Sequence, residues 1–314
     1  MPVKHICVFG IGGIGGVIGS RIITGFRSAG KPTNNIYFIA RGSHRDEIRK
    51  NGLILESEKE THIAKPGLVS SEVEDIPQLD LCILGVKSYD LETACRQLKS
   101  KIKQDTVIIP ILNGVDIYER MREIITTGFI LPGCVYMNAF VKKPGVITHR
   151  SGDVLAYGKD PRHNEFYPVH VREFFGGVPL SVRWHEDPYP VLWKKYLFVA
   201  SYALVTAYSG QTIKNVYNNE ALRALLVEIL EEINAISSKK GYAFPPDVIE
   251  KICLDGGRLP IEATTSYQRD LIDHPARNEG DIFGGAIIRM GEELGVPTPT
   301  TEKLYAGIRL KYNV

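Results

Sequence analysis

The first part of the chain alternates short runs of β-branched and aromatic residues with longer polar or amphipathic stretches. Strand-like runs are predicted at residues 5–9, 36–40, 79–86 and 106–111, and helical spacing at 13–29, 44–51 and 91–101. This alternation is typical of βαβ units that form a parallel sheet. Further strand-like segments at 134–139, 145–149 and 154–157 extend the α/β region to about residue 186.

The segment Glu186-Asp-Pro-Tyr-Pro190 separates two regions of different character. Its prolines are not expected inside a helix, so the domain boundary is placed here. Beyond it the apolar residues recur at three and four positions, which predicts helices at 191–208, 220–239 and 281–294. The expected architecture is an α/β domain at residues 1–186 followed by an all-α domain at residues 187–314.

Composition adds few constraints but excludes some partners. The 314 residues suit about two domains of roughly 100–200 residues each. Lys and Arg total 38 against 36 Asp and Glu, so no strong field favours nucleic acid or a membrane surface. No apolar run reaches the length of a membrane span. The expected partner is a small molecule, and the expected location is the cytoplasm.

The cysteines and histidines show no metal-binding pattern. Five cysteines are far apart, odd in number and without metal-ligand spacing, and the eight histidines form no cluster. We therefore expect no metal and reduced, mostly buried thiols at Cys7, Cys82, Cys95, Cys134 and Cys253.

The first predicted strand runs directly into Gly10-Ile11-Gly12-Gly13-Ile14-Gly15, which opens the first predicted helix. In a GxGxxG loop the first glycine makes the tight turn, the second lets a pyrophosphate approach the backbone, and the third lets helix and strand pack closely. Glycines also serve plain turns, so the signal depends on its setting. Between a strand and a helix, the loop predicts a Rossmann dinucleotide-binding site.

The end of the second predicted strand bears on the choice of nucleotide. NAD enzymes usually place an acid here, whereas a 2′-phosphate needs a cation. This chain has Ala40-Arg41-Gly42 and no acid. The planar guanidinium of Arg41 suits a phosphate, although a solvated surface arginine is the alternative. We expect NADP(H), with helpers among Ser43, His44 and Arg45.

Besides the glycine loop, further short motifs are spread along nearly the whole chain: Phe38-Ile-Ala-Arg41-Gly-Ser-His44, Leu84-Gly-Val-Lys87, Leu112-Asn113-Gly114, Pro144-Gly-Val-Ile-Thr-His149, Leu192-Trp-Lys-Lys195-Tyr and Ser266-Tyr-Gln-Arg-Asp270. Together these motifs resemble those of the ketopantoate reductase (2-dehydropantoate 2-reductase) family. The resemblance implies a Rossmann domain followed by a helical domain like that of 6-phosphogluconate dehydrogenase. It also implies NADPH-dependent reduction of ketopantoate to pantoate, a step towards pantothenate and coenzyme A.

The same resemblance implies further contacts to the cofactor. Lys87 and Asn113 would line its nicotinamide end, Ala139 would touch it through the backbone, and Glu279 would contact the ribose or amide. Ligands of open parallel sheets lie beyond the carboxyl ends of the strands, where Lys87 and Asn113 are expected. The alternatives are a surface charge for Lys87, an ordinary Asn-Gly turn at Asn113-Gly114, and a first-turn helix acid for Glu279.

Lys195 is the catalytic candidate that the resemblance implies. Its ammonium would protonate the carbonyl oxygen as hydride reaches the carbon, a task that suits a cation able to neutralise a developing alkoxide. Ser266 would hydrogen-bond the substrate carboxylate. The alternatives are a snorkelling surface lysine and a serine that caps a helix.

The chain departs from the family where substrate is held. The family usually carries asparagines at the positions that here are Val199 and Ala203, so Tyr202 and Thr206 are either substitute hydroxyls or core. A lost amide contact can change substrate preference by orders of magnitude. Ketopantoate stays the first expectation; another 2-keto or 3-keto acid and a non-catalytic NADPH sensor stay open. A homodimer through helices 220–239 and 281–294 also stays open.

Overall fold

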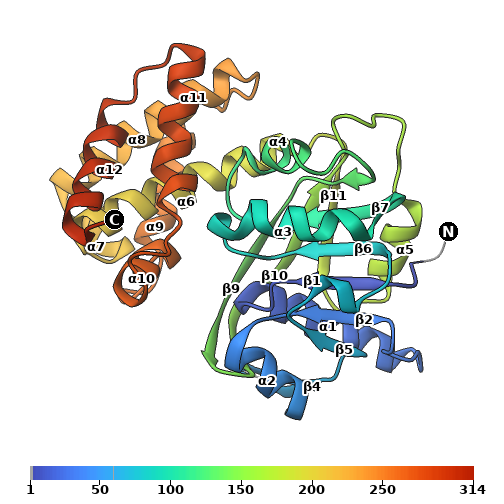
Figure 1. The fold of residues 1–314 in the computed structure, drawn as a ribbon. Coiled ribbons are helices and arrows are strands. Elements are labelled where there is room, and N and C mark those ends of the chain that lie inside the picture. Colours follow the sequence, from blue (N-terminus) through green and yellow to red (C-terminus); the bar gives the residue numbers. More distant parts are fainter. Residues whose placement is uncertain (1–2, 59) are drawn as a thin grey trace. The chain divides into compact units, whose positions relative to one another are not determined.

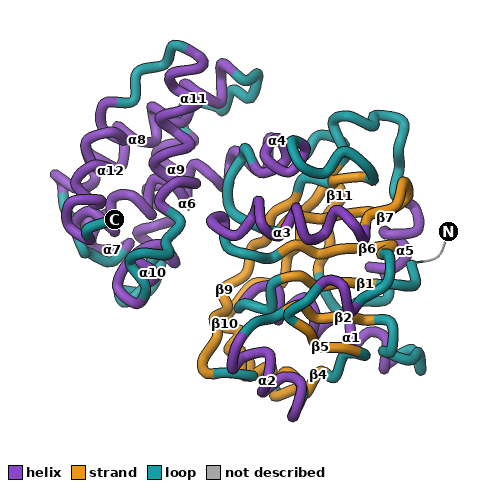
Figure 2. The backbone as a smooth tube through the Cα atoms, viewed as in Figure 1, coloured by secondary structure: helices purple, strands orange, loops and turns teal. Residues whose placement is uncertain are grey.

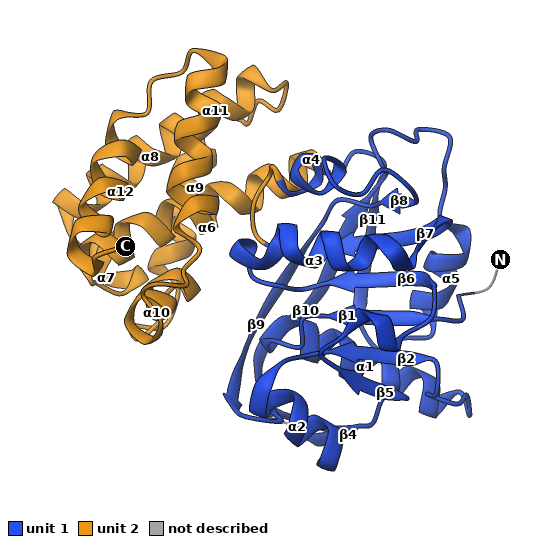
Figure 3. Ribbon diagram, in the orientation of Figure 1, with its two compact units in different colours: residues 1–112, 117–188 blue, residues 113–116, 189–314 orange. Residues whose placement is uncertain are grey.

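A computed structural model describes residues 3–58 and 60–314 (Figure 1). The chain forms two compact units, coloured separately in Figure 3: unit 1 comprises residues 1–112 and 117–188, and unit 2 comprises residues 113–116 and 189–314. Among the described residues, strands occur only in unit 1, whereas unit 2 is built of helices (Figure 2). The predicted fold class, an α/β Rossmann domain followed by an all-α domain, is confirmed.

The main sheet of unit 1 is six-stranded, in the order β5-β2-β1-β6-β7-β8. Every pairing in it is parallel, and the order is that of a Rossmann sheet. The strand order reverses between β1 and β6, so ligands are expected beyond the carboxyl ends of these two strands. The bounds are Ile6–Phe9 (β1), Ile36–Ile39 (β2), Leu68–Ser70 (β5), Leu79–Leu84 (β6), Ile102–Pro110 (β7) and Phe129–Ile130 (β8).

A second, five-stranded sheet belongs to the same unit. It has the order β11-β10-β3-β4, with β9 also paired to β10. The prediction of two separate strands at 145–149 and 154–157 is wrong, because they form one strand. Exposed polar residues interrupt the apolar pattern there, and register shifts bend the strand without ending it. The bounds are Leu53–Ser57 (β3), Thr61–Ala64 (β4), Gly133–Lys143 (β9), Val146–Gly158 (β10) and Ser181–His185 (β11).

Helix α1 (Gly13–Ser28) packs against both sheets. It contacts β1 of the parallel sheet and β3, β4, β9 and β10 of the second sheet, and most of its residues are buried. Because α1 lies against two sheets, its backbone must come close to other backbone segments on two faces of the helix. The remaining helices of unit 1 are α2 (Gly42–Asn51), α3 (Leu91–Leu98), α4 (Ile117–Arg122) and α5 (Val169–Gly176); residues 99–101, predicted as part of a helix, form a separate 3-10 turn.

Glycines on α1 permit this close approach. A Cβ atom at Gly15 would lie 2.0 Å from the carbonyl oxygen of Gly10, at the end of β1. A Cβ atom at Gly13 would lie 2.3 Å from the carbonyl oxygen of Ala139, in β9. Because both neighbours are backbone, neither contact can be relieved by a side-chain rotation. The motif that predicts nucleotide binding is therefore also a packing motif.

Unit 2 is organised around α6 (Tyr189–Ser209), which contacts α7, α8, α10, α12 and the π-helical turn η4. Pro190 lies in its first turn, where a missing N–H has no intrahelical partner, so the expectation that this proline excludes a helix is wrong. None of the described helices is both long and apolar enough to cross a bilayer. The other bounds are Ile213–Asn218 (α7), Glu220–Lys239 (α8), Val248–Gly257 (α9), Ser266–Asp273 (α10), Asp281–Gly285 (η4), Ala286–Leu294 (α11) and Pro299–Tyr312 (α12).

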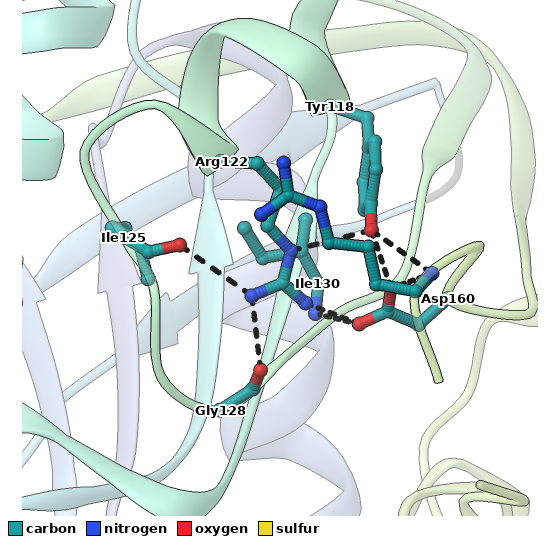
Figure 4. Close-up of polar contacts among 7 residues, drawn as sticks. Tyr118, Arg122, Ile125, Gly128, Ile130 and Asp160 are labelled. Carbon is teal, nitrogen blue, oxygen red and sulfur yellow. Dashed lines mark hydrogen bonds and ion pairs between the residues drawn. The ribbon is translucent and has the colours of Figure 1, made fainter. Parts of the chain in front are cut away.

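A buried ion pair ties α4 to the segment that follows β10 (Figure 4). The side chains of Arg122 and Asp160 are 1% and 0% exposed and form a direct hydrogen bond. The hydroxyl of Tyr118 donates to Asp160 Oδ1 at 2.6 Å, and the backbone N–H of Ile130 donates to Oδ2 at 2.9 Å. Arg122 also donates to the carbonyl oxygen of Gly128 at 3.1 Å. The buried charges are thus paired and hydrogen-bonded, as burial requires.

The Gly25→Ala substitution tests the packing of α1. The new Cβ would lie 2.3 Å from the carbonyl oxygen of Gly177, so we expect a loss of about 1–3 kcal/mol in the free energy of unfolding, measured in urea. The control is Gly176→Ala, whose Cβ would meet no atom within 4 Å. That change should be neutral or stabilising by up to about 1 kcal/mol. Equal stability of the two variants would contradict the packing argument.

The Asp160→Asn substitution tests the buried ion pair. It leaves the charge of Arg122 buried without its counter-ion, and we expect a loss of about 3–5 kcal/mol in the free energy of unfolding. Asp105→Asn is the control, because Asp105 is 43% exposed and pairs with Lys103 at 3.6 Å. That surface pair should contribute about 1 kcal/mol or less. If Asp160→Asn is as stable as Asp105→Asn, the buried ion pair does not stabilise the fold as described.

Candidate active site

The glycine loop leaves room for a phosphate. Gly10 has a φ of 95°, and a Cβ there would lie 2.7 Å from the backbone of Gly85, after β6. By contrast, a Cβ at Gly12 would meet no atom within 4 Å. Gly12 is also the N-cap residue of α1, whose first turn holds no acidic side chain. The space beside Gly12 and the positive end of the helix together fit the pyrophosphate of a dinucleotide.

Two further predicted cofactor residues lie in unit 1. Lys87 follows β6 and is the N-cap residue of a short 3-10 turn, with extended backbone and a half-buried side chain. Ala139 borders the loop directly, since its carbonyl oxygen limits the space at Gly13. The loop, the Gly85 segment and the backbone of Ala139 therefore lie together.

Arg41 stands at the end of β2 as the N-cap residue of α2. Its side chain is 49% exposed, and Nη1 lies 3.3 Å from Asp90 Oδ2. An exposed pair of this kind contributes little, so the guanidinium can exchange this partner for a phosphate at small cost. Of the suggested helpers, His44 accepts at Nδ1 from the backbone N–H of Gly145 at 3.0 Å, and burial lowers its pKa.

Lys195 and Asn113 meet in unit 2 although 82 positions separate them. Lys195 lies in the second turn of α6 and is half-buried; its Nζ donates to Asn113 Oδ1 at 3.0 Å. Asn113 begins a turn in which Gly114 has a φ of 116°. Asp116 lies in the same short segment, and its Oδ2 is 4.0 Å from Nη2 of Arg289. The amide oxygen orients the ammonium group without neutralising its charge.

Tyr196, adjacent to Lys195, was not singled out from the sequence. Its buried hydroxyl donates to the carbonyl oxygen of Ile282 at 2.7 Å and to that of Phe283 at 3.3 Å. Both carbonyls belong to η4, a π-helical turn, a rare element found often at functional sites. Glu279 lies just before this turn and is 4% exposed. It therefore precedes the helix rather than forming part of its first turn.

Ser266 is the first residue of α10 and is half-buried. The helix is capped by Thr265, whose hydroxyl accepts from the backbone N–H of Gln268 at 3.2 Å. The alternative reading of Ser266 as the N-cap is therefore wrong. Its hydroxyl is not needed to cap the helix.

The face of α6 beyond Lys195 is apolar. Tyr202 and Ala203 are fully buried, and the hydroxyl of Tyr202 donates to the carbonyl oxygen of Cys253 at 3.3 Å. The hydroxyl of Thr206 donates to the carbonyl oxygen of Tyr202 at 2.7 Å. Both hydroxyls thus belong to the core of unit 2 and are not substitutes for the family's asparagines. Val199 is only half-buried.

The parallel sheet with its glycine loop, followed by a helical unit carrying a positioned lysine, defines a class of two-domain oxidoreductases that use a dinucleotide. Comparison with known sequences identifies the family. The profile described as "Ketopantoate reductase PanE/ApbA" matches residues 6–162, and "Ketopantoate reductase PanE/ApbA C terminal" matches residues 189–312. The chain belongs to the ketopantoate reductase family and is an oxidoreductase.

Individual relatives are similar over nearly their full length. An uncharacterized oxidoreductase, YkpB, from Bacillus subtilis is 27% identical over 96% of this chain and 97% of its own. A PanE/ApbA family ketopantoate reductase from Ralstonia eutropha has a TM-score of 0.86 and 23% identity, covering 99% and 98% of the two chains. A D-mandelate dehydrogenase, solved with NADH and anilino(oxo)acetate, has a TM-score of 0.86 and 20% identity, covering 98% of each chain. At these identities the two structures establish the fold alone.

The Gly12→Ala substitution separates binding from folding. The added methyl group meets no protein atom within 4 Å and suits a φ of −83°, so we expect the free energy of unfolding to stay unchanged. The methyl occupies the path of the pyrophosphate, so the Kd for a nicotinamide dinucleotide should rise about tenfold or more. Fluorescence titration measures the Kd, with Gly176→Ala as the control. An unaltered Kd in Gly12→Ala would mean that the loop does not hold the pyrophosphate.

Proposed function

We propose that the protein is an NADPH-dependent reductase of 2-keto acids, with ketopantoate as the first candidate substrate and pantoate as its product, on the route to pantothenate and coenzyme A. The observation that carries the proposal is the hydrogen bond between Lys195 Nζ and Asn113 Oδ1. It presents an oriented ammonium group in a chain whose glycine loop fits a dinucleotide. Ketopantoate itself rests on the family alone.

The chemistry of the proposal divides between cofactor and protein. The bound nicotinamide supplies hydride to the keto carbon. Lys195 Nζ holds the proton that the keto oxygen receives as negative charge develops there, and its positive charge stabilises that oxygen. Asn113 accepts one hydrogen bond from the ammonium and so fixes its direction. Ser266 is assigned to the substrate carboxylate.

The same proposal assigns the remaining predicted residues to the nucleotide. Gly10, Ile11, Gly12, Gly13, Ile14 and Gly15 hold the pyrophosphate, and Arg41 holds the 2′-phosphate. Lys87, Asn113 and the Ala139 backbone serve the nicotinamide end, and Glu279 serves the ribose or amide. The exposed guanidinium of Arg41 and the absence of an acid at the end of β2 support NADPH over NADH.

A second candidate substrate class follows from the apolar face of α6. Val199 and Ala203 offer no hydrogen bond to the hydroxyl of ketopantoate, and the hydroxyls of Tyr202 and Thr206 are engaged in the core. These observations favour 2-keto acids whose side chain is branched and purely apolar. The reaction at the keto group is the same for both classes.

Two matched substrates distinguish the classes: ketopantoate and 3,3-dimethyl-2-oxobutanoate, which is ketopantoate without its hydroxyl. We expect both to be reduced, with kcat/KM values within about tenfold of each other, whereas a site built to bond the hydroxyl would reject the second by about 10⁴-fold. NADPH oxidation, followed by absorbance, gives the two values. A preference for ketopantoate of that larger size would place the hydroxyl contact on residues other than Val199 and Ala203.

Lys195→Ala is the control for this assay. It should lower kcat on both substrates by about 10²–10⁴-fold while NADPH still binds. If the wild-type protein binds NADPH and reduces no keto acid of a broad panel, the reductase proposal fails. The nucleotide-sensor alternative then takes its place.

Arg41→Ala tests the choice of nucleotide. Loss of the guanidinium should raise the Kd for NADPH about tenfold or more, because a charge-assisted contact to the 2′-phosphate is removed. NADH lacks that phosphate and serves as the matched control, so its Kd should change little. Equal weakening of both nucleotides would show that Arg41 does not select NADPH.

A further inference from the structure

A cavity of about 300 Å³ lies in unit 1 beside α5, β11 and the end of β10, and is named the α5 pocket. Its inner wall is formed by the buried residues Tyr157, Phe175 and Val178. Half-buried apolar side chains, among them Leu180 and Trp184, form its outer part. The volume is at the lower end of the range for small-molecule sites.

The α5 pocket and the glycine loop lie at opposite ends of α1. Gly25, near the carboxyl end of the helix, packs against Gly177 in the turn beside the pocket. Gly13 begins the same helix at the glycine loop, and 16 residues of α-helix span about 24 Å. No residue assigned above to nucleotide or keto acid lines the pocket. The pocket is therefore separate from the nucleotide loop.

The hydroxyl of Tyr157 is the first sign of a ligand. Tyr157 is 1% exposed, and among the described residues its hydroxyl has no hydrogen-bond partner. Buried hydroxyls are normally paired, so this unpaired one, on a residue that lines the pocket, is a polar group that an occupant reaching the inner wall would satisfy. Burial raises the pKa of Tyr157 to about 12, which keeps the hydroxyl protonated and able to donate.

Arg172 supplies a second donor to the same space. It lines the pocket, and its charge acts on the Tyr157 hydroxyl, opposing the rise in that pKa. Its guanidinium carbon lies 5.0 Å from the ring centroid of Tyr167, which in turn meets Trp184 edge-on at 5.4 Å. These ring contacts hold the cation at the pocket. Among the described residues, those that line the pocket include no carboxylate.

We propose that the α5 pocket binds a small organic carboxylate with an aromatic or branched apolar body. The carboxylate accepts hydrogen bonds from the guanidinium of Arg172 and the hydroxyl of Tyr157, two donors suited to an anion. The body packs against Phe175, Val178 and the ring of Trp184, which supply an aromatic and aliphatic wall. The site needs neither the nucleotide nor Lys195.

The experiment titrates phenylacetate into the full-length protein with isotope-labelled leucine and valine methyl groups. Phenylacetamide is the matched probe, since it keeps the body and removes the charge. We expect phenylacetate to shift the methyl signals of Val178 and Leu180, equally in the wild-type protein and in Lys195→Ala. Arg172→Gln, a change at an exposed side chain, should raise the Kd about tenfold or more.

Tyr157→Phe keeps the ring and removes only the hydroxyl. It should raise the Kd for phenylacetate about fivefold, with thermal unfolding measured alongside to show that the fold is retained. The proposal is overturned if the pocket methyls do not shift, or if phenylacetamide binds as tightly as phenylacetate. It is also overturned if Arg172→Gln leaves the Kd unchanged, or if binding disappears in Lys195→Ala, which would place the probe at the keto acid site.

Discussion

The close packing of α1 between two sheets is the constraint on which unit 1 depends. A helix buried on two faces leaves no room for side chains where backbone meets backbone, and Gly13, Gly15 and Gly25 each occupy such a point. Gly12, in the same loop, faces open space instead. One short sequence thus fixes the helix against β1 and β9 and leaves its positive end accessible to a pyrophosphate. The packing of α1 and the proposed nucleotide binding use one motif because both need a backbone without side chains.

Unit 2 applies a similar constraint to α6. The middle of this helix is buried on all sides, so its direction is set by the helices packed around it. Lys195 lies near the beginning of α6, where burial is incomplete. The position of its backbone is therefore fixed by the packing of the helix. The neighbouring Tyr196 ties the same turn to η4 through two carbonyl contacts. The flexible side chain of Lys195 is thereby held on rigid elements, which is the arrangement that the proposed proton transfer requires.

Sequence patterns predicted those parts of the structure that have long, regular signals. The main strands of the parallel sheet, α1, α6 and α8 were predicted within a few residues, because their apolar runs are continuous or helically spaced. Strands β3, β4, β5, β8 and β11 were missed, since none of them is longer than five residues. The two strands predicted at 145–149 and 154–157 are one, because a bulged strand tolerates a polar interruption that a sequence pattern reads as an end.

In the candidate site, too, residues that are adjacent in sequence were predictable, whereas contacts between distant residues were not. The glycine loop was recognisable because its residues are adjacent in sequence, and the family resemblance supplied Lys195. The hydrogen bond from Lys195 to Asn113 joins residues that only the fold brings together. The anchoring role of Tyr196 was invisible for another reason: a buried tyrosine beside tryptophan and leucine resembles core until its hydroxyl partner is known. Tyr202 and Thr206 show the reverse, being polar by sequence and core by structure.

The central claim is that Lys195 supplies the proton to the reduced keto oxygen. Rescue of Lys195→Ala by added methylammonium tests it most directly, with tetramethylammonium as a cation of the same charge that carries no transferable proton. The account predicts that NADPH oxidation by the variant rises with methylammonium concentration and does not respond to tetramethylammonium. Equal effects of the two cations, or turnover by Lys195→Ala at the wild-type rate without either, would contradict it.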